Sequence, residues 1–265
     1  MLSHQTLVDS FRRLGIAPGS RLLVHSALRA LGPVEGGAAT VLDALLECVG
    51  PEGLIAVPTF TYFNETFDPE TSPSRTGALT EILRKRSGAV RSLHPTHSIA
   101  AIGEGADELC ASHHGRPGLG IDSPLDRIAR SGGGILLLGV GHTSNSTVHV
   151  GEAHAGVPYL GVPFDPTWPT SITIKSGSDE LTYTVHEHPG CSRAFGAIEA
   201  SLRAKSSIRD AMIGKALVQH VVGQDVIAST VELLSRNPAA LLCRDDSCYR
   251  CSRARAQLSA SAAGS

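Results

Sequence analysis

The 265-residue sequence contains no apolar run of the roughly 18 residues that a membrane-spanning helix needs. It also lacks an excess of charge of either sign, because 23 Lys and Arg stand against 25 Asp and Glu. Neither nucleic acid nor a membrane surface is therefore indicated as a partner. Residues 1–10 lack the basic start and apolar middle of a secretory signal. We expect a cytoplasmic protein whose six cysteines are thiols or metal ligands rather than disulfides.

Two common catalytic and cofactor-binding motifs are absent as well. The position three residues after Gly141 is Ser144, so Gly139-Val-Gly141 does not match a dinucleotide-binding fingerprint. The Gly-x-Ser-x-Gly elbow of many hydrolases does not occur. A hydrolase using Ser26 or Ser144 with a histidine and a carboxylate therefore stays only an alternative. The sequence shows no internal repeat.

The N-terminal half alternates buried-strand patterns with helical ones. Residues 21–25 and 54–60 are apolar strand candidates, and residues 36–49 between them carry an apolar stripe at helical spacing. This order is typical of a parallel, right-handed crossover unit. We expect a single domain over 1–265, with a three-layer α/β/α sandwich over about 1–158.

The pattern changes after Pro158. Alternating apolar residues flank the turn at 176–179, which predicts a hairpin, and residues 216–222 and 224–234 predict a strand and an amphipathic helix. We expect a smaller, mainly antiparallel lobe over 159–242. A cysteine-rich tail follows at 243–265, and its Ala/Ser/Gly end after Leu258 is expected to fray.

Residues 131–159 are predicted to form a strand, a loop and a short helix. Residues 135–140 are an unbroken apolar run, and 143–147 offer hydroxyl and amide groups that can cap a helix. Within that helix His149 and Glu152 are three residues apart, so they share a face. A base beside a carboxylate, at the carboxyl end of a buried strand, indicates a catalytic site, although such pairs are often only solvated charges.

Three cysteines cluster near the C-terminus in the spacing Cys243-x4-Cys248-x2-Cys251. Thiols this close suit a tetrahedral zinc site, which needs a fourth ligand. Cys191 is the first candidate for that ligand and His188 the second. We expect one structural zinc that attaches the tail to the hairpin lobe, and its removal should leave catalysis largely intact. Unliganded thiols on a loose tail are the alternative.

Five segments together resemble the aminoglycoside 3-N-acetyltransferases, the antibiotic N-acetyltransferase family, whose fold differs from that of the GNAT superfamily. The segments occur in the family's order and cover roughly residues 5–235: 24–37, 92–98, 123–127, 136–141 and 147–152. The resemblance implies transfer of an acetyl group from acetyl-CoA to an amine at the 3-N position of an aminoglycoside, a mode of antibiotic resistance. The partners would be coenzyme A and a small-molecule amine, bound by a monomer or a homodimer.

The resemblance also implies roles for individual residues. His149 would be the general base and Glu152 its orienting partner. Thr147 would donate a hydrogen bond to the oxyanion of the tetrahedral intermediate, or would only cap the helix. The coenzyme A pyrophosphate would lie near Ser26, Ala27 and Leu28, a loop that could otherwise be an ordinary turn. Ser123 would contact the pantetheine arm or cap a helix.

Residues for the acceptor are less directly indicated. The resemblance implies that His94 and His97 line the cleft wall, with a purely structural role as the alternative for His97. Glu65 and Asp68 lie on a long polar loop where carboxylates could bind a polycationic drug. Arg75 on the same loop is a departure from that pattern, so an amine other than an aminoglycoside is the alternative acceptor.

Overall fold

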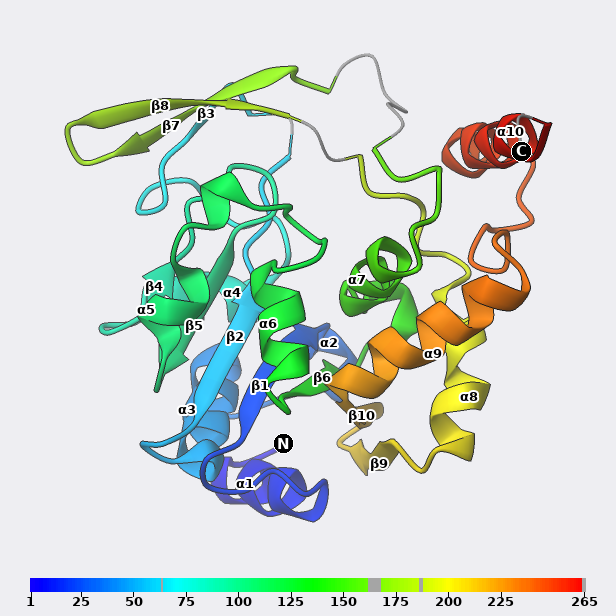
Figure 1. The fold of residues 1–265 in the computed structure, drawn as a ribbon. Coiled ribbons are helices and arrows are strands. Elements are labelled where there is room, and N and C mark those ends of the chain that lie inside the picture. Colours follow the sequence, from blue (N-terminus) through cyan, green and yellow to red (C-terminus); the bar gives the residue numbers. More distant parts are fainter. Residues whose placement is uncertain (63, 162–167, 186–187, 264–265) are drawn as a thin grey trace.

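The computed structural model describes residues 1–62, 64–161, 168–185 and 188–263. Its centre is a seven-stranded sheet in the order β4-β5-β2-β1-β6-β10-β9 (Figure 1). The central strand β1 pairs in parallel with β2 and β6, whereas the outer pairings are antiparallel. The strands are β1 (Arg21–Ser26), β2 (Leu54–Pro58), β4 (Val90–Arg91), β5 (Ile99–Gly103), β6 (Gly134–Leu138), β9 (Ile208–Ile213) and β10 (Ala216–Val222).

Helices cover both faces of this sheet. The helices of the described chain are α1 (His4–Arg13), α2 (Leu28–Leu31), α3 (Gly37–Val49), α4 (Ala78–Arg84), α5 (Ala106–Cys110), α6 (Pro124–Arg130), α7 (Thr147–His154), α8 (Glu199–Ala204), α9 (Gly223–Arg236) and α10 (Tyr249–Ala263), the last of which lies away from the sheet. Short 3₁₀ turns lie at η1 (His113–Gly115), η2 (His142–Ser144) and η3 (Phe195–Ile198). Within the described ranges, none of the helices has the length and apolar character required to cross a bilayer.

Strand alternation divides the interior into two cores. On β1, Leu22 and Val24 join the core that contains α1, α3 and α4. Leu23 points the other way, into the core that contains α5, α6, α7 and α9. Successive side chains of a strand point to opposite faces, so a central strand covered on both faces is apolar throughout. The three-layer α/β/α arrangement, and the parallel crossover from β1 through α3 to β2, are confirmed.

The described part of the C-terminal half is mainly antiparallel, as expected, and two of its strands belong to the main sheet. The strands β9 and β10 extend the main sheet, because β10 pairs antiparallel with β6, and α9 packs on α7. The predicted hairpin is present as β7 (Ser171–Ser176) and β8 (Asp179–Thr184), which form a small second sheet with β3 (Thr66–Phe67). The tail is also more regular than expected, since α10 continues to Ala263; residues 264–265 lie outside the described residues.

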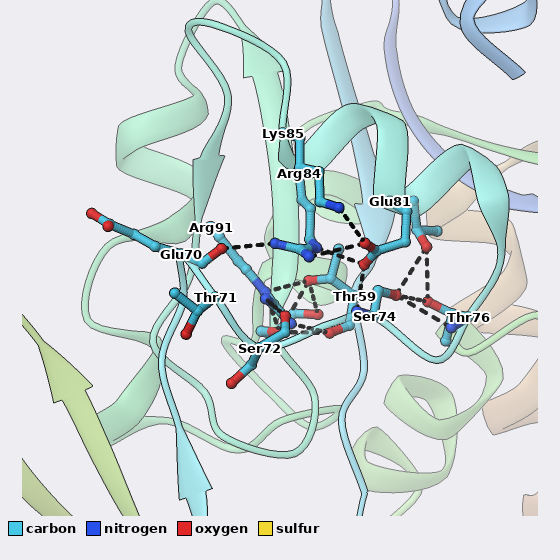
Figure 2. A network of polar contacts seen from close by, with 12 residues as sticks. Thr59, Glu70, Thr71, Ser72, Ser74, Thr76, Glu81, Arg84, Lys85 and Arg91 are labelled. Atoms are coloured by element: carbon cyan, nitrogen blue, oxygen red, sulfur yellow. Dashed lines mark hydrogen bonds and ion pairs between the residues drawn. The ribbon is translucent and has the colours of Figure 1, made fainter.

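The polar loop between β2 and α4 is held by a half-buried arginine, Arg91 (Figure 2). The guanidinium of Arg91 donates to the carbonyl oxygens of Thr59 at 2.8 Å and Pro69 at 3.2 Å, and to that of Ser72. It also lies over the ring of Phe67, 4.9 Å from the centroid. Burial lowers the pKa of Arg91 to about 10. These contacts attach the described part of the loop to β4.

Candidate active site

The loop after β6 and the start of α7 are organised by Asn145. Its Oδ1 accepts the backbone N–H of Thr147 at 3.2 Å, and its Nδ2 lies 3.3 Å from His142 Nδ1. The helix that follows is buried over its first six residues. Gly151 allows this burial, because a Cβ there would lie 2.4 Å from the Cβ of Thr230 on α9. The sequence predicted the helix and its polar start, but not this close packing.

His149 and Glu152 form the central hydrogen bond of the site. His149 Nδ1 lies 2.6 Å from Glu152 Oε2, and the two residues are 8% and 2% exposed. The other oxygen, Glu152 Oε1, accepts the hydroxyl of Tyr159 at 2.9 Å. Burial and the neighbouring carboxylate raise the pKa of Tyr159, so it remains a donor. Because His149 Nδ1 donates to the carboxylate, its Nε2 is the nitrogen left for a substrate.

Two cavities meet at His149. The first, of about 370 Å³, begins at Ser26 on the carboxyl end of β1 and carries several hydroxyl groups and Arg250. The second, of about 340 Å³, is mainly apolar. Residues common to both linings are His97, Leu119, His149 and Pro189. The location agrees with the general rule that α/β sheets bind ligands beyond the carboxyl ends of their strands.

His25 belongs to the first cavity, although the sequence analysis assigned it no role. It is 5% exposed, and its Nε2 has no hydrogen-bond partner among the described residues. Burial lowers its pKa to about 4, so the imidazole is neutral near pH 7 and can accept or donate a hydrogen bond to a ligand. A histidine near the end of an otherwise apolar strand was the signal that could have identified it.

Other lining residues come from distant segments. Phe195 contacts the imidazole of His149 edge to face, with 4.7 Å between ring centroids. Trp168 and Arg250 also line the first cavity. Neither these residues nor Tyr159 carry a spacing in the sequence that connects them to His149, so sequence reasoning missed them.

Thr147 is fully buried at the first turn of α7, and its hydroxyl has no hydrogen-bond partner within the part of the chain that the structure describes. It lines neither cavity. The side chain that binds a backbone N–H at this helix start belongs to Asn145 instead. The role of Thr147 toward an oxyanion remains a prediction.

The residues predicted for coenzyme A are distributed differently from expectation. Ser26 lines the first cavity. The amide of Ala27 already donates to the carbonyl of Leu138 at 2.9 Å, so it does not serve a phosphate in this conformation. Leu28 begins α2. Ser123 is fully buried, lines neither cavity and accepts the amide of Asp126 at 3.3 Å, so its role here is to cap α6.

Of the two histidines expected to line the cleft, His97 lines the cavities and His94 does not. His94 Nδ1 accepts the backbone N–H of His97 at 3.1 Å, and its Nε2 lies 3.0 Å from the hydroxyl of Tyr183. It is fully buried and lines neither cavity, which makes it structural. His97 is the residue that lines both cavities. The error arises because Tyr183, which fixes His94, is distant in the sequence.

The acidic loop residues lie away from the two cavities. The carboxylate of Asp68 accepts the amides of Glu70 at 2.8 Å and Thr71 at 3.2 Å. These contacts close a local turn, and they lower the pKa of Asp68 against the opposing effect of burial. Glu65 is exposed beside β3, where its carbonyl accepts the amide of Thr173. Neither residue lines the cavities, and no carboxylate within the described ranges does.

The four predicted cysteine ligands come together. The sulfur atoms of Cys191, Cys243, Cys248 and Cys251 all lie within 4.8 Å of one another. All four are free thiols, and three of them are buried. The other two cysteines, Cys48 and Cys110, lie separately in the two main cores. His188, the second candidate for the fourth ligand, is not part of this group.

Comparisons with known proteins identify the family. The sequence profile of the family described as aminoglycoside 3-N-acetyltransferase matches residues 23–235. Aminoglycoside N(3)-acetyltransferase IV from Salmonella sp. is 31% identical over 239 residues, which cover 89% of this chain and 88% of that protein. Aminoglycoside N(3)-acetyltransferase VII from Streptomyces paromomycinus is 31% identical over 257 residues, covering 85% and 89%.

A solved structure gives the same result. A histidine-to-alanine mutant of the aminoglycoside acetyltransferase AAC(3)-IVa, in complex with a gentamicin, superposes with a TM-score of 0.86 at 29% identity. The match covers 97% of each chain. The profile, the curated relatives and the fold all indicate the same family. The chain therefore belongs to the aminoglycoside 3-N-acetyltransferase family of acyltransferases.

Proposed function

We propose that the protein transfers the acetyl group of acetyl-CoA to the 3-amine of an aminoglycoside, with His149 as general base. The observation that carries the proposal is the hydrogen bond of 2.6 Å between His149 Nδ1 and Glu152 Oε2, located where the two cavities meet. Membership in the family supports acetyl transfer as the reaction class. The gentamicin complex of a relative supports an aminoglycoside as acceptor.

The proposed reaction begins when the amine nitrogen attacks the thioester carbonyl carbon. A C–N bond forms, and His149 Nε2 accepts the proton that the amine nitrogen loses. The buried carboxylate of Glu152 stabilises the resulting imidazolium. The tetrahedral intermediate then collapses and the C–S bond breaks. The leaving sulfur takes up the proton from the His149 imidazolium, so coenzyme A departs as the thiol. Positioned general-base catalysis of this kind contributes roughly a hundred- to ten-thousand-fold in rate.

The first cavity suits the coenzyme A arm. Its lining includes Ser26, the hydroxyl-bearing residues of the loop after β6, and the guanidinium-bearing Arg250. Hydroxyl and guanidinium groups are suited to phosphates and to the amides of pantetheine. We place the coenzyme beside Ser26, which lines this cavity; the amide of Ala27 is hydrogen-bonded to Leu138, and Leu28 begins the helix that follows.

Thr147 is the proposed donor to the carbonyl oxygen that becomes anionic. Its buried hydroxyl has no other partner among the described residues, and because it lines neither cavity, the role requires substrate binding to bring the carbonyl oxygen within its reach. Removing one such donor costs roughly a hundred- to a thousand-fold in kcat in enzymes of this type. The variant Thr147→Val should show that loss while Thr147→Ser does not, and equal activity of the two variants would contradict the role.

The function is tested with untagged protein, acetyl-CoA and a panel of amines, by following release of free thiol. The panel contains gentamicin, apramycin, simple primary amines and an aminoglycoside already acetylated at its 3-amine. We expect release that requires an aminoglycoside with a free 3-amine. Release without any acceptor would indicate the hydrolase alternative with Ser26 or Ser144, and release with simple amines alone would indicate a different acceptor.

A further inference from the structure

We infer that Cys191, Cys243, Cys248 and Cys251 bind one Zn²⁺, and that this metal holds a wall of the active-site cavity in place. Their sulfur atoms lie within 4.8 Å of one another. In a tetrahedral site with Zn–S bonds of about 2.3 Å, the sulfurs are roughly 3.8 Å apart, so a small adjustment accommodates the ion. No other group of three or more potential ligands is this close among the described residues.

The donor set selects the metal. Four thiolates at the corners of a tetrahedron favour zinc or iron–sulfur chemistry and disfavour magnesium, calcium and manganese. A mononuclear zinc site of four cysteines is closed to further ligands and is therefore structural. The three ligands at 243, 248 and 251 lie in one short segment, and the fourth comes from the segment between β8 and η3. The ion would join two distant parts of the chain.

Neighbouring groups already support the cluster. Backbone amides donate to two of the sulfurs: that of Arg193 to Cys191 Sγ at 3.5 Å, and that of Cys243 to Cys251 Sγ at 3.3 Å. Such hydrogen bonds stabilise thiolates and orient metal ligands. An ion pair between Arg193 and Asp245 joins the two segments independently of the cysteines.

An arginine also offsets the charge of the site. A zinc ion with four thiolates carries a net charge of about −2, which a nearby cation stabilises. Arg255 on α10 lies against this segment, since its Nη1 donates to the carbonyl of Cys243 at 2.9 Å. Figure 1 shows α10 beyond the C-terminal end of α9, away from the main sheet, so the cluster anchors it.

The cluster is next to the active site. Cys191 lies between Gly190 and Ser192, which both line the first cavity, and Arg250, adjacent to Cys251, lines it too. On its other side, a small cavity is lined by Cys191 and Cys251 together with Glu152 and Tyr159. Removing the ion would therefore release residues of the cavity wall. This revises the expectation that metal removal leaves transfer intact.

The first test is metal content, which does not depend on activity. Untagged full-length protein is analysed for metals, and zinc released by a mercurial reagent is titrated. We expect one zinc per chain, released as four thiols react. The double variant Cys191→Ser/Cys248→Ser should lose the zinc, whereas Cys48→Ser, a buried cysteine remote from the cluster, should keep it. Zinc well below one equivalent, iron in its place, or zinc retained by the double variant would overturn the inference.

The second test concerns the cavity wall. Wild-type protein is stripped of zinc with a chelator, and kcat and KM are measured before and after zinc is restored. We expect kcat/KM to fall on the order of ten-fold or more and to recover with zinc, because small displacements of a positioning wall carry large rate costs. Zinc loss with unchanged kcat/KM would overturn the role at the cavity. Because the metal measurement needs no turnover, inactivity toward every aminoglycoside would count against the proposed function and not against the site.

Discussion

Glu152 holds His149 from one oxygen and Tyr159 from the other, at 2.6 and 2.9 Å. Glu152 is 2% exposed, and each of its carboxylate oxygens has a hydrogen-bond partner in the protein. A buried carboxylate with two donors is fixed in orientation and in turn fixes the imidazole. Tyr159 follows the end of α7 in sequence. The helix and the turn after it therefore position His149 together.

Glu152→Gln should lower kcat by about 10- to 1,000-fold, less than the loss of His149 itself. The amide can still accept from His149 Nδ1, but it carries no charge to stabilise the imidazolium. Steady-state kinetics check this against Glu180→Gln, an exposed glutamate on β8 that should change nothing. A larger loss from Glu152→Gln than from His149→Ala would require the two roles to be reassigned.

Gly151→Ala should destabilise the protein by about 1–3 kcal/mol, because the new methyl group overlaps Thr230 where α7 packs on α9. At a helix position with room for the methyl group, the greater helix propensity of alanine would instead stabilise the protein. Gly115→Ala is the matched control, since nothing lies within 4 Å of a Cβ added there. Denaturant unfolding measures both variants, and equal midpoints would show that the packing is not as tight as described.

Acidification should destabilise the protein between about pH 6.5 and pH 4. Burial lowers the pKa of His25 to about 4, and burial also lowers the pKa of His142 and of His220. In this window the unfolded chain binds protons that the folded chain does not. The free energy of unfolding therefore decreases as the pH is lowered. His25 alone accounts for roughly 3 kcal/mol of the decrease in the free energy of unfolding across this window. His25→Gln should flatten the pH dependence of unfolding, and an unchanged slope would refute the assignment.

The local sequence pattern was sufficient to predict the central elements of the fold. The apolar run of β6, the polar loop after it and the spacing of His149 and Glu152 on α7 were all predicted, because each depends on neighbours in sequence. The pairing of β10 with β6 was not predicted. A strand that joins a sheet from far along the chain has the same periodicity as one that forms a separate lobe.

Two predicted site residues lie outside the cavities, for different reasons. His94 was expected in the cleft, but the hydroxyl of Tyr183, 89 residues away, fixes it in the interior. Asp68 was expected to bind the acceptor, yet its carboxylate is used by the amides of its own turn. The cysteine cluster was predicted because three of its four members share one short segment, and only Cys191 had to be found at a distance.

The proposed reaction requires His149 as the general base, and a second histidine on α7 offers a control. His154 lies on the same helix and makes a similar contact, with its Nε2 2.9 Å from Asp126 Oδ1, but it lines neither cavity. The decisive measurement is aminoglycoside-dependent thiol release from acetyl-CoA by His149→Ala and His154→Ala, with coenzyme A binding measured for both. We predict that His149→Ala loses turnover by at least roughly a hundred-fold while binding coenzyme A within a few-fold, and that His154→Ala keeps its turnover. Near wild-type turnover in His149→Ala would contradict the central claim.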